Sequence, residues 1–143
     1  MTRSKEAPVK SIRFCADKAA FALAVVVLAV STGRTAGATS RDQERAAAAI
    51  EQDLKTDPNN AELWLHLGFA YRKINKIDQS QQAFEKASTL SPGEKDSWFM
   101  LGLIYESKRD RQAASNAWKR YLAVETDAEK RAVAEKHIHH LSQ

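Results

Sequence analysis

The histidines are the residues of this sequence whose chemistry and spacing first suggest a site. His66 lies inside the aromatic stretch WLHLGFAY, and three more histidines occur in the run HIHH at residues 137–140. His137 and His140 are three positions apart, so on a helix they could share a metal ion. Zinc usually takes three or four protein ligands, and the few residues that follow supply none. We therefore predict no metal site; at a helix C-terminus these side chains complement the helix dipole.

Catalytic motifs are absent from the sequence. It has no glycine-rich phosphate loop, no nucleophile elbow and no His-Glu metal helix, which are the local patterns that position phosphates, serine nucleophiles or zinc. Paired carboxylates on short helices are typical of a solvated surface. The sequence therefore predicts a protein that is not an enzyme, with no catalytic residue and no cofactor.

The net charge of +4 does not indicate a nucleic-acid partner. Six basic and two acidic residues fall within the first 38 positions, and the remainder has sixteen of each sign, interspersed. Binding to a phosphate backbone needs lysines and arginines clustered on one face. We expect no nucleic-acid binding.

The N-terminal segment, residues 1–38, is predicted to be a signal peptide or a membrane anchor. A polar, basic stretch is followed by an uncharged apolar run of 12 residues, Ala19–Val30, which is typical of a signal-peptide core and short for a membrane span. Cleavage is expected after the A-x-A pattern Ala36–Ala38, or alternatively after Ala29–Ser31. An uncleaved anchor remains the other interpretation, because Arg34 and the distance from the apolar run suit cleavage poorly.

Both interpretations export the rest of the chain, because basic residues before the apolar run keep the N-terminus in the cytoplasm. Residues 39–143 are then expected in the periplasm, soluble or anchored to the inner membrane, with membrane contact only through the N-terminal segment. They contain no cysteine, so packing and not disulfides must stabilise them.

The stretch WLHLGFAY is followed 34 residues later by a similar stretch, WFMLGLIY. Trp64, Leu67 and Tyr71 are spaced i, i+3 and i+7, so they form one stripe of a helix. Gly68 lies among them, and a glycine inside a helix costs about 1 kcal/mol relative to alanine. A second helix that approaches closely is the reason we expect for it. The same four residue types recur in register at Trp98, Leu101, Gly102 and Tyr105.

This pattern resembles the tetratricopeptide repeat, a helix–turn–helix unit with this period and a Trp-x-x-Leu-Gly-x-x-Tyr opening. Phe84, Ala87 and Pro92 match the second helix of the repeat, and Ser80 replaces the usual alanine. The resemblance is to small exported bacterial proteins of the family. It implies an all-α, right-handed solenoid that acts through protein–protein interaction.

The period and the helix signals predict six helices, at about 41–55, 61–74, 78–90, 95–108, 111–124 and 127–141. The domain is expected to contain a half repeat, two full repeats and a capping helix, over residues 41–58, 61–92, 95–125 and 127–141. Asn59, Ser91 and Thr126 have the spacing of helix caps. Trp118 and Tyr121 take the places of Phe84 and Ala87, which predicts a capping helix at a different angle instead of a regular neighbour.

The resemblance implies that the first helix of each repeat lines the concave face. Leu65, Phe69, Phe99 and Leu103 would form an apolar patch there, and such patches tend to mark interfaces. The candidate partner-binding residues are Leu65, Phe69, Arg72, Lys73, Phe99, Met100 and Leu103, with Glu62, Asp96 and Glu106 beside them.

Other uses of these surfaces remain open. The patch could pack on itself or form a homodimer. Alternatively, the protein could be a subunit of a larger envelope complex, such as one for c-type cytochrome maturation, with the Trp118/Tyr121 end or the capping helix as its contact. The identity of the protein or peptide partner is not encoded in these patterns.

Overall fold

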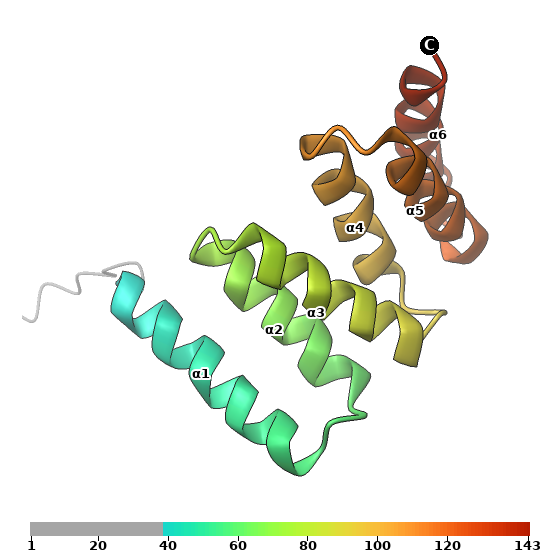
Figure 1. Ribbon diagram of the computed structural model, residues 1–143. Coiled ribbons are helices and arrows are strands. Elements are labelled where there is room, and N and C mark those ends of the chain that lie inside the picture. The colour runs from blue at the N-terminus through green and yellow to red at the C-terminus, as the bar shows by residue number, and fades with distance from the viewer. Residues whose placement is uncertain (1–38) are drawn as a thin grey trace, which may run out of the picture. The chain divides into compact units, whose positions relative to one another are not determined.

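The computed structural model describes residues 39–143, and the predicted signal peptide or anchor lies outside them. This part of the chain is entirely helical, as expected, and its helix bounds differ from the predicted ones by no more than one residue (Figure 1). The helices are α1 (Ser40–Thr56), α2 (Ala61–Lys73), α3 (Ile77–Leu90), α4 (Lys95–Ser107), α5 (Arg111–Val124) and α6 (Ala128–Leu141).

The helix caps predicted at Asn59, Ser91 and Thr126 are wrong, because the residue that caps each helix lies one to three positions further along the chain. Ser91 ends α3 instead, and its carbonyl accepts the backbone N–H of Glu94 in the turn that follows. The Glu94 carboxylate then caps α4 by accepting the first free N–H groups of that helix, at 2.9 and 2.8 Å. The side chains that cap α2, α4 and α6 are Asn60, Glu94 and Asp127.

Consecutive helices pack against each other along the described chain, with α2 on α3 and α4 on α5 as the most extensive pairs (Figure 1). A left-handed residue closes the turn inside each of these pairs, Asn75 with φ 59° and Arg109 with φ 62°. Asparagine tolerates this conformation better than arginine does. Both turns fall at the same position of the repeat.

Two aromatic rings lie directly against helix backbone at the two repeated glycines. A Cβ built on Gly68 would be 2.6 Å from the Phe84 ring, and one on Gly102 would be 2.6 Å from the Trp118 ring. Real Cβ atoms do not approach that closely, so only glycine fits. The expectation of a closely approaching helix at Gly68 is therefore met, by α3.

The Trp118/Tyr121 end is not the contact surface that the sequence suggested for a larger complex. Trp118 occupies in the second repeat the position that Phe84 has in the first. Its ring packs on Gly102 as the Phe84 ring packs on Gly68, and 0% of its surface is exposed. A large side chain there fits a regular repeat because the missing Cβ of Gly102 makes the room. Tyr121 is likewise buried, at 4% exposure. The Trp118/Tyr121 end is thus core and not an available contact surface.

The other motif residues are held by polar contacts that also repeat. The Trp64 indole donates to the Pro58 carbonyl at 2.8 Å, and the Trp98 indole donates to the Pro92 carbonyl at 2.9 Å. The Tyr71 hydroxyl donates to Glu51 at 2.5 Å. Burial and this carboxylate raise the pKa of Tyr71 to about 12. In the second repeat, the matching pair is Tyr105 and Glu85, at 2.6 Å.

We predict that Gly102→Ala lowers the free energy of unfolding. The added methyl group must displace the buried Trp118 ring, and overpacking of this kind costs about 1–3 kcal/mol. The better helix propensity of alanine offsets about 1 kcal/mol of that cost. Urea unfolding of the full chain, followed by far-UV circular dichroism, should give a net loss of up to about 2 kcal/mol.

Gly93→Ala is the matched control. It lies in a turn without a positive φ, and a Cβ there would meet no atom within 4 Å. The control should be neutral, or should stabilise by about 0.4–1 kcal/mol through the unfolded state. Equal losses in the two variants would contradict the close-packing explanation.

Candidate functional site

The apolar residues predicted for the partner surface lie on α2 and α4, and we call the surface they form the α2–α4 face. The side chains of Leu65, Phe69, Phe99 and Leu103 are half-buried and pack against the core clusters of the second repeat. They therefore help to close the joint between the repeats and also leave apolar surface exposed. Arg72 and Lys73 are exposed at the C-terminal end of α2.

Met100 does not belong to the surface to which it was assigned. It is only 4% exposed, and its side chain packs in the core with Phe84 and Leu101. Its sulfur lies 3.3 Å from Nη1 of Arg72, which joins α2 to α4. Helical spacing puts Met100 beside Phe99, but the position of α3 decides which of the two side chains is covered.

The two phenylalanines of the α2–α4 face are anchored by other aromatic rings. Phe69 meets Phe84 edge to face, with ring centroids 5.1 Å apart. Phe99 meets Trp118 in the same way at 5.3 Å and lies 5.4 Å from the Tyr121 ring. Such pairs hold a ring in one orientation, so these side chains offer a rigid surface.

A cavity of about 340 Å³ opens beside Phe99, where α4, α5 and α6 meet. Its exposed apolar member is Val133, at 45% exposure. Sequence reasoning missed this cavity because its lining comes from three successive helices, whose relative placement no local pattern indicates. The lining residues are Lys95, Asp96, Phe99, Tyr121, Glu125, Lys130 and Val133.

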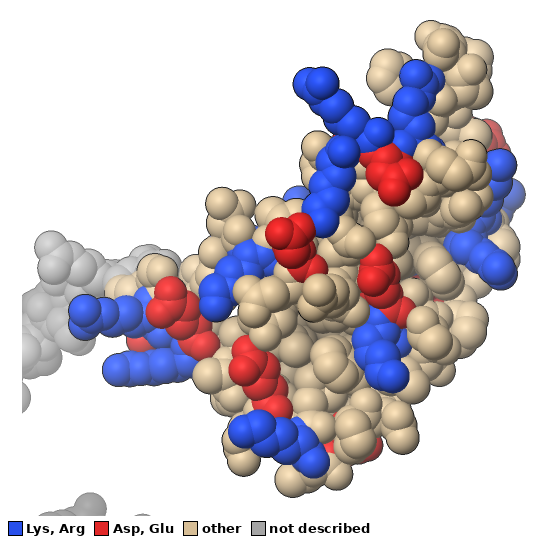
Figure 2. Space-filling model, in the orientation of Figure 1, with Lys and Arg blue, Asp and Glu red and all other residues tan. Residues whose placement is uncertain are grey.

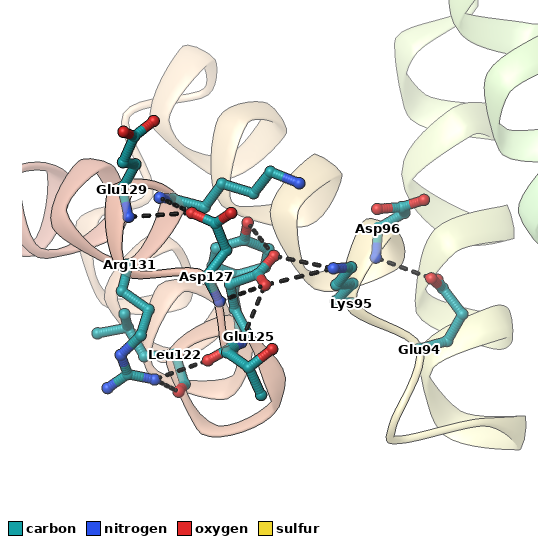
Figure 3. Close-up of polar contacts among 11 residues, drawn as sticks. Glu94, Lys95, Asp96, Leu122, Glu125, Asp127, Glu129 and Arg131 are labelled. Atoms are coloured by element: carbon teal, nitrogen blue, oxygen red, sulfur yellow. Dashed lines mark hydrogen bonds and ion pairs between the residues drawn. The ribbon is translucent and has the colours of Figure 1, made fainter.

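Glu125 is a buried carboxylate at the rim of this cavity, with 3% of its surface exposed. One of its oxygens accepts the backbone N–H groups of Thr126 and Asp127 at 2.9 and 3.0 Å, and the other accepts the Tyr121 hydroxyl at 2.9 Å. Lys95 of α4 completes the cluster with an ion pair of 3.1 Å (Figure 3). These contacts tie the start of α4 to the turn between α5 and α6.

The hydrogen bonds settle the protonation states in this cluster. The N–H of Asp127, with the Tyr121 hydroxyl and Lys95, lowers the pKa of Glu125 to about 2, against the cost of burial. Burial and the same carboxylate raise the pKa of Tyr121 to about 12. Glu125 is therefore an anion, and Tyr121 a neutral donor, at any pH near neutrality.

Arg131 of α6 closes the same turn from the other side. Its Nη1 donates to the carbonyls of Leu122 and Glu125, which are free acceptors at the C-terminal end of α5 (Figure 3). The cluster is therefore connected to α4, α5 and α6 at once.

The histidines divide into one buried in part and three exposed. The His137 ring stacks on Trp118 with centroids 4.4 Å apart, and its Nδ1 is 2.9 Å from Glu106. Glu106 also accepts the Trp118 indole N–H at 2.7 Å. His137 therefore docks α6 onto α5. His66, His139 and His140 are exposed.

Within residues 39–143, no group of three or more His, Cys, Asp or Glu side chains is placed to hold a metal ion. In the same range, no helix is both long and apolar enough to cross a membrane. On the face shown in Figure 2, acidic and basic side chains are interspersed, so it has no stripe of one sign.

The helices at residues 61–94 and 95–125 each match the family model of the tetratricopeptide repeat. The solved structure of MamA resembles the chain with a TM-score of 0.62 and 27% identity, over 72% of this chain and 58% of that one. The described helices thus form a solenoid of the tetratricopeptide type.

Curated relatives are similar over shorter stretches. The formate-dependent nitrite reductase complex bifunctional subunit NrfFG of Haemophilus influenzae is 44% identical over 48 residues, which is 34% of this chain. The chloroplastic tetratricopeptide repeat domain-containing protein PYG7 of Arabidopsis thaliana is 35% identical over 52% of this chain. The matched segments span only 12% and 25% of the length of these two relatives.

We predict that Glu125 makes the protein sensitive to acid. Because its pKa falls from 4.5 when unfolded to about 2 when folded, its contribution to stability is complete above about pH 4.5 and is lost as the pH falls towards 2. Glu125→Gln should therefore lower the melting temperature at neutral pH, and should reduce the further loss between pH 4.5 and 2. Thermal unfolding followed by circular dichroism measures both effects.

Glu129→Gln on the exposed first turn of α6 is the control for this experiment, since it removes the same charge without breaking the cluster. It should keep the acid sensitivity of the wild type. An unchanged pH dependence in Glu125→Gln would contradict the role given to this carboxylate.

Proposed function

We propose that this chain, whose residues 61–94 and 95–125 are tetratricopeptide repeats, is a non-catalytic adaptor. It binds a segment of a partner protein on the α2–α4 face. The observation that carries this proposal is the row of half-buried apolar side chains on the first helices of two successive repeats. Apolar surface that stays exposed beside polar residues is typical of an interface. Arg72 and Lys73 supply polar groups at its edge.

The rigidity of the face supports a binding role. Phe69 and Phe99 are already held by ring contacts with the core. A partner that buries them therefore loses little side-chain entropy on the side of this protein. Binding by a preformed surface fits an adaptor, whose task is to bring other chains together.

A role as a subunit of a larger assembly is the second candidate. The relative from Haemophilus influenzae that supports it is described as a subunit of a nitrite reductase complex. In this case the contact would use the outer side of α6, because Trp118 and Tyr121 are buried. We propose the cell envelope as the location of either role, from the basic start and apolar run of residues 1–38.

Leu65→Asp should remove partner binding and leave the fold intact, because it puts a charge on an apolar surface that is only half-buried. The test is affinity purification from extracts of the native host, with bound proteins identified by mass spectrometry. We expect a loss of at least about tenfold in the specific partner, as for an interface hot spot. Lys119→Glu, on the exposed side of α5, is the control.

Circular dichroism must first show that Leu65→Asp is folded. A folded variant that keeps every partner would refute the α2–α4 face. Sedimentation of the wild type addresses self-association: a dimer that Leu65→Asp dissociates would make a second copy of this chain the occupant of the face.

The proposed export can be tested separately. If residues 1–38 are a cleaved signal peptide, N-terminal sequencing of the native protein should begin at Thr39, or near residue 32 for the alternative site. An intact start in a membrane fraction would identify an anchor. An intact start in a soluble cytoplasmic fraction would contradict export.

A further inference from the structure

The cavity at the junction of α4, α5 and α6 has properties that the rest of the α2–α4 face lacks. It is hollowed, with a volume of about 340 Å³, and three helices form its walls. We propose that this cavity binds an apolar side chain of the partner segment and that Lys130 and Lys95 bind a neighbouring Asp or Glu of that segment. The inference rests on the proposed adaptor function and names the chemistry of the segment that is bound.

The interior of the cavity suits an aliphatic or aromatic side chain. The Phe99 and Tyr121 rings line it, and their centroids are 5.4 Å apart. Val133 of α6 completes the lining and is 45% exposed, on a helix whose only buried residue is Ala134. An apolar side chain placed here covers Val133 and the exposed part of the Phe99 ring, which is favourable because apolar area leaves water.

The buried carboxylate at the rim is not available to a basic ligand. Four donors already occupy the Glu125 oxygens: the Tyr121 hydroxyl, two backbone N–H groups and the Lys95 ammonium. A carboxylate has about four lone-pair sites, so a further donor would have to displace one of these. The carboxylate that remains accessible at the cavity is that of Asp96, which is exposed.

The ammonium groups, by contrast, have donors to spare. Within residues 39–143, the Lys95 ammonium is paired with Glu125 alone, and its side chain is 42% exposed, so part of its capacity of three N–H donors faces solvent. Lys130 is exposed, and its ammonium has no hydrogen-bond or ion-pair partner among residues 39–143. Among the residues that line the cavity, two available ammonium groups thus face one available carboxylate. Both lysines also lie in the first turn of a helix, where the helix dipole favours an anion.

The arrangement therefore favours a partner segment in which an apolar residue stands within one or two positions of an acidic one. A basic neighbour would meet Lys130 and Lys95, and among the residues that line the cavity it would find only Asp96 to pair with. Burial of Glu125 is what decides this preference, because it removes one of the two acidic groups from reach.

The probe for the test is a phage-displayed library of random linear peptides, selected on the full-length protein. Enriched peptides should combine Leu, Ile or Phe with a nearby Asp or Glu. Synthetic copies of the most enriched peptide, measured by fluorescence anisotropy, should bind Val133→Asp and Lys130→Glu at least about tenfold more weakly than the wild type. Lys119→Glu makes the same charge change away from the cavity and should bind normally.

Val133→Asp and Lys130→Glu are both expected to fold. Val133 is exposed, and Lys130→Glu introduces a carboxylate three residues after the Asp127 cap, where it favours the start of a helix. Circular dichroism provides the check, and Val133→Ala serves as the milder variant should Val133→Asp unfold. Weakened binding can then be assigned to the cavity.

Four results would overturn the inference. Selection of apolar peptides with basic neighbours, dependent on Asp96, would refute the acidic preference. Peptides that bind both cavity variants normally but lose Leu65→Asp would refute the cavity and leave the adaptor function standing. Peptides indifferent to all of these changes would refute the cavity as well. A library with no enriched sequence would also refute it, while the purification with Leu65→Asp would still decide the adaptor function by itself.

Discussion

The contact of an aromatic ring with a helix backbone that has no Cβ is the constraint on which the rest of this structure depends. Phe84 over Gly68 and Trp118 over Gly102 bring the two helices of each repeat to a distance that no other residue permits. Polar contacts of the same repeats add to it: Trp64 and Trp98 donate to carbonyls that precede their helices, and Tyr71 and Tyr105 donate to glutamates of the neighbouring repeat. A larger side chain at either glycine would have to displace the ring, and with it the packing of the second helix on the first.

Much of the fold could be predicted because the spacing of residues within each repeat indicates its helices and how they pack. The spacing of Trp64, Leu67 and Tyr71 marks one face of a helix, and its recurrence 34 residues later identifies the family. Turn residues fix the helix bounds almost as well. The caps were misplaced because Ser91 and Glu94 both have capping chemistry, and only the path of the turn decides which of them is used.

The candidate site is less predictable, because its members come from three different helices whose relative placement is set by tertiary packing. Phe99 was identified as a surface residue, but its neighbours Tyr121 and Val133 belong to α5 and α6. Met100 differs from Phe99 by one helical position, and only the placement of α3 and Arg72 shows that it is covered. The burial of Trp118 is hard to predict for a related reason, since the space for its large ring is provided by Gly102 on another helix.

Glu125 breaks the pattern of the repeat, and it links the end of the solenoid to the proposed binding site. Ser91 stands at the equivalent place in the first repeat, where it simply ends α3 before the next helix. Glu125 instead lies buried and gathers Lys95, Tyr121 and the first N–H groups after α5. This holds the start of α6 near α4 and α5, so that Val133 and Lys130 reach a cavity that Phe99 also lines. The residues that repeat therefore build the scaffold, and the ones that break the repeat shape the surface available to a partner.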